Sequence, residues 1–294
     1  MDNILEFTAT ARINSLYWIT SLHDRELGVT RRVLEELEPI CVARQLPFQC
    51  YSPSNAKEFL AAMDNITSYA GMGMLPLIHF DTHGSAEDGI KIVGSGEHIG
   101  WPEIAAKLRA INATTGNNLC IVSGACNSFS IVGQVDIHQT TPAFILLAPE
   151  NEIIAGEIEE NIVGFYRDML DNEDILTSRD KWFKNQLRMY HSERFLAVIL
   201  AKYLHNTTIG RQLHRRKEHL VTMALAGREH QATPEVLRAL RDSAKALIKP
   251  SEDLIERFRP TFRAGKQPGF TIAQLRAGVL QARADGISPD GIYA

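Results

Sequence analysis

Two short stretches place reactive side chains directly after an apolar run. The stretch "IHFDTHGS" ends such a run with His79, Asp81 and His83 and then breaks at Gly84. A second stretch, "NLCIVSGACNS", ends in the same way and leaves Cys126 just beyond its apolar part. A thiol becomes a good nucleophile when a neighbouring imidazole takes or stabilises its proton. The two stretches therefore indicate a Cys–His nucleophilic site, provided that they meet in space.

The elements that must position these residues follow from hydrophobic periodicity. Strands are expected at 14–22, 47–52, 74–83, 117–125 and 142–149, and helices at 29–46, 54–70, 102–112 and 155–170. A glycine-containing hairpin is expected directly after Gly84, and Pro39 should kink or interrupt its helix. The alternation predicts an α/β fold with a mostly parallel sheet covered by helices on both faces. In such sheets, functional residues gather at the carboxyl ends of the strands.

His83 and Cys126 are separated by one hairpin, one helix and one strand. A right-handed crossover would set their two strands side by side, with both exits at the same edge. Attack on a carbonyl also requires hydrogen-bond donors for the oxyanion that forms. The backbone N–H groups of Gly84 and Cys126 are the expected donors, and the small residues "SGA" before the cysteine leave room for a substrate backbone.

The order of these motifs resembles the caspase-like cysteine peptidases of clan CD, most of all the bacterial caspase-like domains that include those called CHAT. The resemblance covers roughly residues 12–171 and is carried by "FDTHGSAEDGIKI", "HIGWPEIAAKLRAIN", "NLCIVSGACNS" and "GEIEENIVGFYRDML". It implies a caspase-like sheet, His83 and Cys126 as the catalytic dyad, a peptide bond as the target, and no cofactor. The caspases proper have Cys-Arg-Gly at the nucleophile, whereas this chain has "CNS", so their preference for aspartate is not implied.

The resemblance also suggests where the substrate residue before the cut would bind. In that family the pocket is built from loops after the first and fifth strands and near the cysteine. The candidate pocket residues here are Asp24, Arg25, Asp81, Glu150 and Glu152. An acidic lining would favour Lys or Arg in the substrate, whereas Arg25 would favour an acidic residue. The acidic character of the first half of the chain favours a basic substrate residue.

A metal site is the alternative interpretation of the first stretch. Alternate strand residues point to one face, so His79, Asp81 and His83 have a spacing that suits a transition metal. No second cluster of ligands is evident, so no metal is predicted. Asp81 is expected to hold His83 or to shape the pocket, and His79 is expected to be interior.

Cysteine content and termini indicate the compartment. The 294-residue chain has four cysteines without CxxC spacing, which favours a reduced setting over a zinc ribbon or a disulfide framework. The start of the chain lacks signal-peptide features, and no run approaches the roughly 18 apolar residues of a membrane helix. A cytoplasmic protein is therefore expected. The cysteines other than Cys126, which are Cys41, Cys50 and Cys120, are expected to be small buried hydrophobic residues.

The charge distribution suggests two parts. Residues 1–170 carry 10 Lys and Arg against 21 Asp and Glu, whereas residues 171–294 carry 21 against 14. We therefore predict a caspase-like peptidase domain at 1–171 and an all-helical region at 172–294. The basic region is expected to dock on the chain itself or to bind a regulatory protein partner. Its run "RQLHRRKEH" is typical of a solvated helix face, and nucleic-acid binding is the less favoured reading.

Three functions follow from these features. The first is a cysteine endopeptidase that acts on a protein or peptide substrate, regulated as an effector of a bacterial antiviral defence or cell-death system. The second is a catalytically silent caspase-like module that binds a partner through its basic helices. The third is a metal hydrolase centred on His79, Asp81 and His83.

Overall fold

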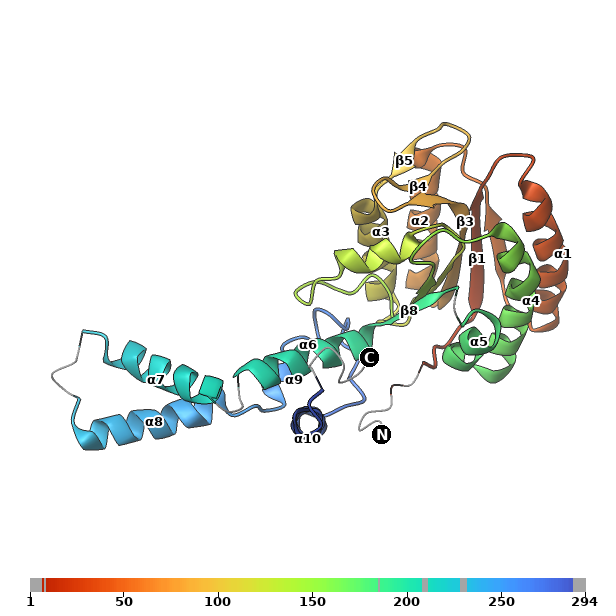
Figure 1. Cartoon of the computed structure of the whole chain (residues 1–294). Coiled ribbons are helices and arrows are strands. Elements are labelled where there is room, and N and C mark those ends of the chain that lie inside the picture. The colour runs from red at the N-terminus through yellow and green to blue at the C-terminus, as the bar shows by residue number, and fades with distance from the viewer. Residues whose placement is uncertain (1–6, 8, 185, 208–210, 228–231, 288–294) are drawn as a thin grey trace. The chain divides into compact units, whose positions relative to one another are not determined.

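The computed structural model describes residues 7, 9–184, 186–207, 211–227 and 232–287 of the chain (Figure 1). The chain divides into two compact units. The larger unit comprises Thr8–Ser192 and Arg259–Gln267, and the smaller unit comprises Met1–Phe7, Glu193–Phe258 and Pro268–Ala294. The division after Ser192 differs from the boundary near residue 172 that the charge pattern suggested.

The larger unit is built on one mixed sheet with the strand order β2-β1-β3-β6-β7-β8. These strands are β1 (Ser15–Ser21), β2 (Phe48–Tyr51), β3 (Pro76–Ser85), β6 (Cys120–Ser123), β7 (Ile145–Ala148) and β8 (Arg188–His191). The pairs along this order are parallel, except that β8 runs antiparallel to β7. A hairpin of β4 (Gly89–Lys91) and β5 (His98–Ile99) extends from the end of β3. The expected α/β class with a mostly parallel sheet is confirmed.

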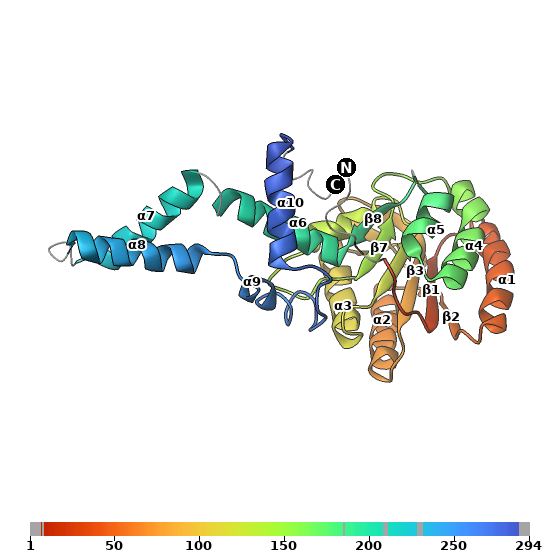
Figure 2. The same cartoon turned by 90° about the horizontal axis from the view of Figure 1, so that it is seen from below.

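Helices cover both faces of this sheet (Figures 1 and 2). The helices α1 (Leu27–Ala43) and α4 (Ala155–Asn172) pack together on one face, with α5 (Ile175–Trp182) against α4. The other face carries α2 (Ala56–Gly71) and α3 (Trp101–Thr114). All seven residues of β1 are buried, as expected for a strand covered on both sides.

Helix α1 passes through Pro39 without ending there, which corrects the expectation of an interruption. Pro39 itself is exposed, while Val33, Leu37 and Cys41 on the same helix are buried. The burial of this apolar face offsets the backbone hydrogen bond that a proline removes.

The region after residue 172 is not all helical, because β8 forms the last strand of the sheet. Its four residues, "RMYH", are too few to give a strand pattern, and the pairing partner β7 lies far away in the sequence. The larger unit also includes Arg259–Gln267, whose Phe262 carbonyl accepts a hydrogen bond from the Thr141 N–H at 3.1 Å. Both corrections arise from contacts between segments that are distant in the chain.

The smaller unit is helical in the part that the structure describes. It contains α6 (Ser192–Thr207, of which Ser192 belongs to the larger unit), α7 (Arg211–Leu225), α8 (Pro234–Ile248), α9 (Asp253–Glu256) and α10 (Ile272–Ala284). Helices α7 and α8 pack side by side, and Glu218 pairs with Arg241 across them at 3.1 Å (Figures 1 and 2). His214, Arg215 and His219 of the basic run are exposed, as expected for a solvated face. Within the described ranges, none of the helices combines the length and apolar character that a membrane span requires.

His79 is interior, as expected. Its ring stacks on Trp18 with centroids 3.6 Å apart, its Nδ1 lies 2.7 Å from the Tyr166 hydroxyl, and its side chain is fully buried. Burial disfavours the charged imidazolium and lowers the pKa of His79 from 6.5 to about 3. The folded protein therefore holds His79 neutral, whereas the unfolded chain protonates it below pH 6.5.

This difference makes folding stability depend on pH. Between pH 6.5 and about 3 the unfolded state binds one more proton at His79, so stability falls as the pH falls. We expect His79 alone to lower the free energy of unfolding by about 2 kcal/mol between pH 7 and pH 5. Urea denaturation of the full chain at both pH values measures this loss. The His79→Gln variant should show a pH dependence smaller by that amount, and an unchanged dependence would contradict the prediction.

Candidate active site

The exits of β3 and β6 meet at one edge of the sheet. The two strands pair in parallel with Phe80 opposite Ser123, and the Gly124 N–H donates to the Phe80 carbonyl at 2.8 Å. Beyond this point, a Cβ added to Gly84 would lie 2.5 Å from the carbonyl oxygen of Cys126. The backbones approach so closely that a side chain at Gly84 would require a shift. The expectation that the two stretches meet is therefore confirmed.

Cys126 lies in a turn that is hydrogen-bonded to the loop after β7. The Ile153 N–H points at the Cys126 sulfur, with 3.4 Å between nitrogen and Sγ. The next residue, Asn127, has a left-handed backbone with φ of 58°, and its N–H donates to the Asn151 carbonyl at 3.0 Å. A 3-10 helix, Ser128–Gln134, follows. The turn leaves the thiol partly exposed, and the thiol in turn donates to the Ile153 carbonyl at 3.9 Å.

The Cys126 N–H fits the expected role of an oxyanion donor. Among the described residues, none accepts a hydrogen bond from it. An N–H without a protein acceptor, next to a thiol, can stabilise a negatively charged oxygen that is bound there. The corresponding role of the Gly84 N–H stays a prediction.

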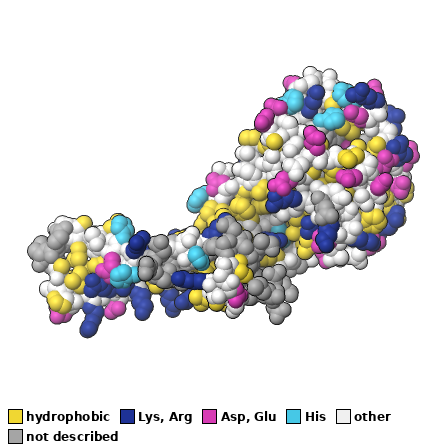
Figure 3. All heavy atoms as spheres, in the orientation of Figure 1, with side chains coloured by type: hydrophobic (Ala, Val, Ile, Leu, Met, Phe, Trp, Pro, Cys, Tyr) yellow, Lys and Arg dark blue, Asp and Glu magenta, His cyan; other side chains and the backbone are white. Residues whose placement is uncertain are grey.

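His83 is held by a residue that the sequence did not single out. Its Nε2 lies 2.9 Å from Oε2 of Glu26, in the turn that leads into α1. Burial raises the pKa of Glu26, but hydrogen bonds from His83 and from the backbone of His23 outweigh it and lower the pKa below its ordinary value. A charged Glu26 therefore orients the imidazole through this contact. Histidine side chains gather with acidic ones at this end of the larger unit (Figure 3).

The His83 ring does not hydrogen-bond to the Cys126 sulfur in the described structure. With Nε2 engaged by Glu26, the ring nitrogen Nδ1 is without a partner among the described residues. The close approach between the two segments is made by Gly84, the residue after His83, and the backbone carbonyl of Cys126. The arrangement suits a histidine that serves the leaving group of a bound substrate rather than one that touches the thiol beforehand.

Asp81 does not hold His83, which corrects that expectation. Its carboxylate accepts hydrogen bonds from the Thr30 hydroxyl at 2.6 Å and from the Trp18 ring N–H at 3.3 Å. Burial raises the pKa of Asp81 above its ordinary value. Although Asp81 alternates with His79 and His83 along β3, its carboxylate is hydrogen-bonded to Thr30 of α1 and to Trp18 of β1. The three residues therefore do not form the alternative metal site in the described structure.

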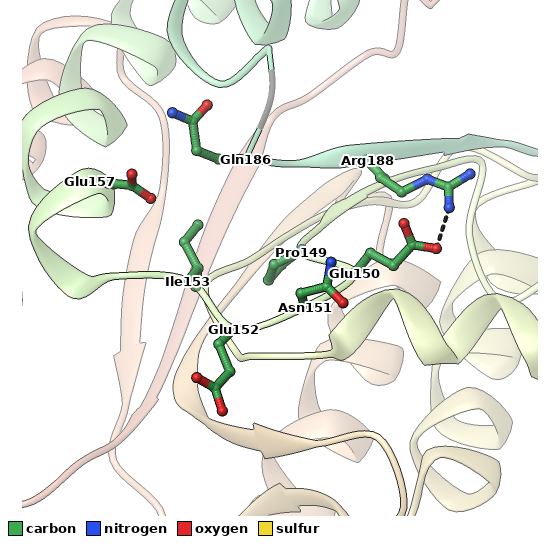
Figure 4. A pocket seen from close by; sticks show the side chains of 8 residues that line it. All are labelled: Pro149, Glu150, Asn151, Glu152, Ile153, Glu157, Gln186 and Arg188. Carbon is green, nitrogen blue, oxygen red and sulfur yellow. Dashed lines mark hydrogen bonds and ion pairs between the residues drawn. The ribbon is translucent and has the colours of Figure 1, made fainter.

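A cavity of about 320 Å³ lies beside the loop that follows β7 (Figure 4). Its lining consists of Pro149, Glu150, Asn151, Glu152, Ile153, Glu157, Gln186 and Arg188. Ile153 belongs both to this lining and to the surroundings of the Cys126 sulfur. The cavity and the Cys126 sulfur therefore share a neighbour in Ile153.

The charge of this cavity is predominantly acidic. Glu150 is paired with Arg188, as the dashed line in Figure 4 marks. Glu152 and Glu157 have no ion-pair partner in the described part of the chain, and Glu157 extends from α4 toward the cavity. Glu150 and Arg188 neutralise each other, so Glu152 and Glu157 leave the cavity with two negative charges. These charges suit the binding of a cationic side chain.

Of the five candidate pocket residues, the structure places only two in the lining of this cavity. Glu150 and Glu152 line the cavity, whereas Asp24, Arg25 and Asp81 do not. Asp24 and Arg25 are exposed in the turn before α1. Sequence reasoning missed Glu157 and Arg188 because α4 and β8 reach the cavity only through the fold. The only sequence signal was that Glu157 follows the loop "PENE" closely, whereas Arg188 is distant from that loop in the sequence.

The remaining cysteines differ from Cys126 in accessibility. Burial raises the pKa of Cys41 to about 11 and that of Cys120 to about 12, so both thiols stay protonated and inert. Cys50 is exposed as a whole residue, which corrects the expectation that it is buried, although desolvation of its thiol raises its pKa. It lies at the end of β2, a strand at the rim of the sheet.

Comparisons with known proteins add no assignment. No protein-family model matches the chain, and no curated protein matches it. The function proposed below is based on the residues and their geometry, together with the resemblance of the motifs.

Proposed function

We propose that this chain is a cysteine endopeptidase with Cys126 as nucleophile and His83 as the proton-transferring residue. The observation that carries the proposal is the junction of the β3 and β6 exits, where Gly84 packs on the backbone of Cys126. It puts an imidazole, a partly exposed thiol and a free backbone N–H at one edge of the sheet. An acidic cavity beside the sulfur offers a place for a substrate side chain.

In the first half of the reaction, the Cys126 thiolate attacks the carbonyl carbon of a peptide bond. A carbon–sulfur bond forms, and the carbonyl electrons move to oxygen, where the Cys126 N–H stabilises the negative charge. The tetrahedral intermediate collapses by breaking the carbon–nitrogen bond. The imidazolium of His83, supported by Glu26, gives its proton to the departing amine, which leaves a thioester on Cys126.

In the second half, water attacks the thioester carbonyl. His83 takes one proton from this water, and the carbon–sulfur bond breaks when the new tetrahedral intermediate collapses. The products are a carboxylic acid and the free Cys126 thiolate, with His83 protonated again. No cofactor takes part in this scheme, and the dyad returns to its starting charge state.

The setting of the enzyme is also part of the proposal. The resemblance to bacterial caspase-like proteins supports a regulated effector in a defence or cell-death system. Few cysteines and no disulfide framework are consistent with a reduced, cytoplasmic environment. The basic residues of 172–294 would bind a regulatory protein partner, because a peptidase in such a compartment requires restraint.

A second function is favoured by one observation, which is the absence of a hydrogen bond between His83 and the Cys126 sulfur in the described structure. Under that alternative the chain is a catalytically silent caspase-like module that binds its partner through the helical region. An unreactive Cys126, together with partner binding that is insensitive to changes at His83, would support it.

The acidic cavity predicts the substrate preference. Peptides with Lys or Arg before the cut should be cleaved at least about tenfold faster than matched peptides with Asp or Leu, because a charge-assisted contact is worth roughly 1.5–3 kcal/mol. The Glu157→Gln variant should lose about tenfold in kcat/KM on the basic peptides. A library of peptides that vary only at this position, analysed by mass spectrometry, measures both effects.

The matched control for this experiment is Glu160→Gln, which removes an exposed carboxylate from the same helix but not from the cavity. We expect this variant to behave as the wild type. Cleavage that favours Asp, or a Glu160→Gln loss equal to that of Glu157→Gln, would contradict the assignment of the pocket. The absence of any cleavage across the library would contradict the peptidase itself.

A further inference from the structure

Three potential metal ligands converge at the edge of the sheet where His83 lies. They are His23, Glu26 and His83, and one ligand atom of each lies within 4.8 Å of the others. His23 and Glu26 belong to the turn between β1 and α1, whereas His83 comes from the end of β3. Two imidazoles and a carboxylate form a ligand set that suits a divalent transition metal such as zinc, and suits magnesium or calcium poorly.

The spacing of these groups is close to what a zinc ion needs. Bond lengths near 2.1 Å place tetrahedral ligands about 3.4 Å apart. The His83 Nε2 and the Glu26 Oε2 are 2.9 Å apart, and the rings of His23 and His83 have centroids 6.0 Å apart with an interplanar angle of 49°. Because one ligand atom of each residue lies within 4.8 Å of the others, side-chain rotations can bring the three donors to zinc distances.

The turn that carries two of the ligands is held in place. The Glu26 N–H donates to the His23 carbonyl at 2.8 Å, and the His23 N–H donates back to the Glu26 Oε2 at 3.1 Å. The other carboxylate oxygen, Oε1, has no partner among the described residues. It is therefore free to bind an ion. The side chains of Glu26 and His83 are 32% and 44% exposed, so an ion can enter and water can complete its coordination.

We propose that His23, Glu26 and His83 bind one zinc-type ion and that this ion switches off the peptidase. Binding would replace the hydrogen bond between His83 and Glu26, with the metal on Nε2 and the single ring proton on Nδ1. A metal-bound ring cannot become an imidazolium, so it cannot deliver a proton to the leaving amine. The regulatory part of this inference rests on the proposed function, whereas the binding part does not.

Metal binding is tested on the full-length chain after treatment with a chelator. Zinc is titrated in competition with a chromogenic chelator, and cobalt is added separately to give a visible absorption spectrum that reports nitrogen and oxygen ligands. The wild type should bind one equivalent, and His23→Ala should bind at least about tenfold more weakly. His98→Ala, which removes an exposed histidine from β5, is the matched control and should bind as the wild type does.

Two outcomes would overturn the metal site. One is equal affinity in the wild type and in His23→Ala. The other is weaker binding in Cys126→Ala, because it would place the metal on the thiolate rather than on this cluster. His23 is exposed, so its substitution should preserve the fold, and His23→Asn provides a second variant with a polar side chain of similar size. Thermal unfolding without metal checks both variants.

The regulatory part is tested with the peptide assay. Zinc should inhibit the wild type, and a chelator should restore cleavage. His23→Ala should keep its basal activity and require at least about tenfold more zinc for the same inhibition. Equal inhibition of both proteins, or stimulation by zinc, would overturn the switch. A chain that binds zinc through His23 but cleaves no peptide would support the metal site and contradict the peptidase.

Discussion

Replacement of Cys126 by alanine is expected to abolish peptide cleavage. The substitution removes the atom that forms the covalent intermediate, and loss of a catalytic nucleophile typically costs about 10⁴-fold or more in kcat. The fold should persist, because Cys126 is only partly buried and alanine removes a single sulfur. The measurement is kcat/KM on a cleavable peptide, accompanied by thermal unfolding and by labelling with a thiol-directed peptide electrophile.

The control for this result is Cys50→Ser, which changes the cysteine that is exposed as a whole residue. We expect Cys50→Ser to cleave and label as the wild type does, and Cys126→Ala to lose both properties. Mass spectrometry should map the electrophile to Cys126, since Cys41 and Cys120 are buried and their raised pKa values keep them protonated. Cleavage that persists in Cys126→Ala would rule out the mechanism.

Replacement of His83 by alanine should lower kcat by about 10² to 10⁴-fold, the range typical for loss of a general acid or base. The leaving amine then departs without a proton donor, because Glu26 loses the imidazole through which it acts. The effect should appear in kcat more than in KM, since His83 does not line the cavity proposed to bind the substrate side chain. Steady-state kinetics on one peptide separate the two parameters.

His98→Ala serves as the matched control, because His98 is an exposed histidine on β5, in the hairpin that follows His83. Its activity should equal that of the wild type. If His83→Ala retained full activity, the proton would have to come from another group, and His23, whose ring lies 6.0 Å from that of His83, would be the first to test.

Much of the fold could be predicted because its signals are local. The apolar runs of β1, β3 and β6 are buried and continuous, and the amphipathic pattern of α1 and α4 has helical periodicity, so each segment reveals its structure by itself. Parallel strands also align their carboxyl ends, which allowed the meeting of the His83 and Cys126 segments to be predicted.

The hydrogen-bond partners of His83 and Asp81 could not be predicted, because they come from segments that are distant in the sequence. Glu26 lies 57 positions from the histidine it holds, and the pairing of β1 with β3 brings the two together. The same reason applies to Asp81, whose partners Trp18 and Thr30 come from neighbouring elements rather than from its own strand.

By itself, the sequence determined the α/β class and the placement of a histidine and a cysteine at two strand ends, because periodicity and glycine positions act over a few residues. The tertiary structure decided which carboxylate meets His83, which residues line the cavity next to Cys126, and where the sheet ends. Strand β8 illustrates the reason: four residues carry too little pattern to be recognised, and their pairing with β7 is set by the fold.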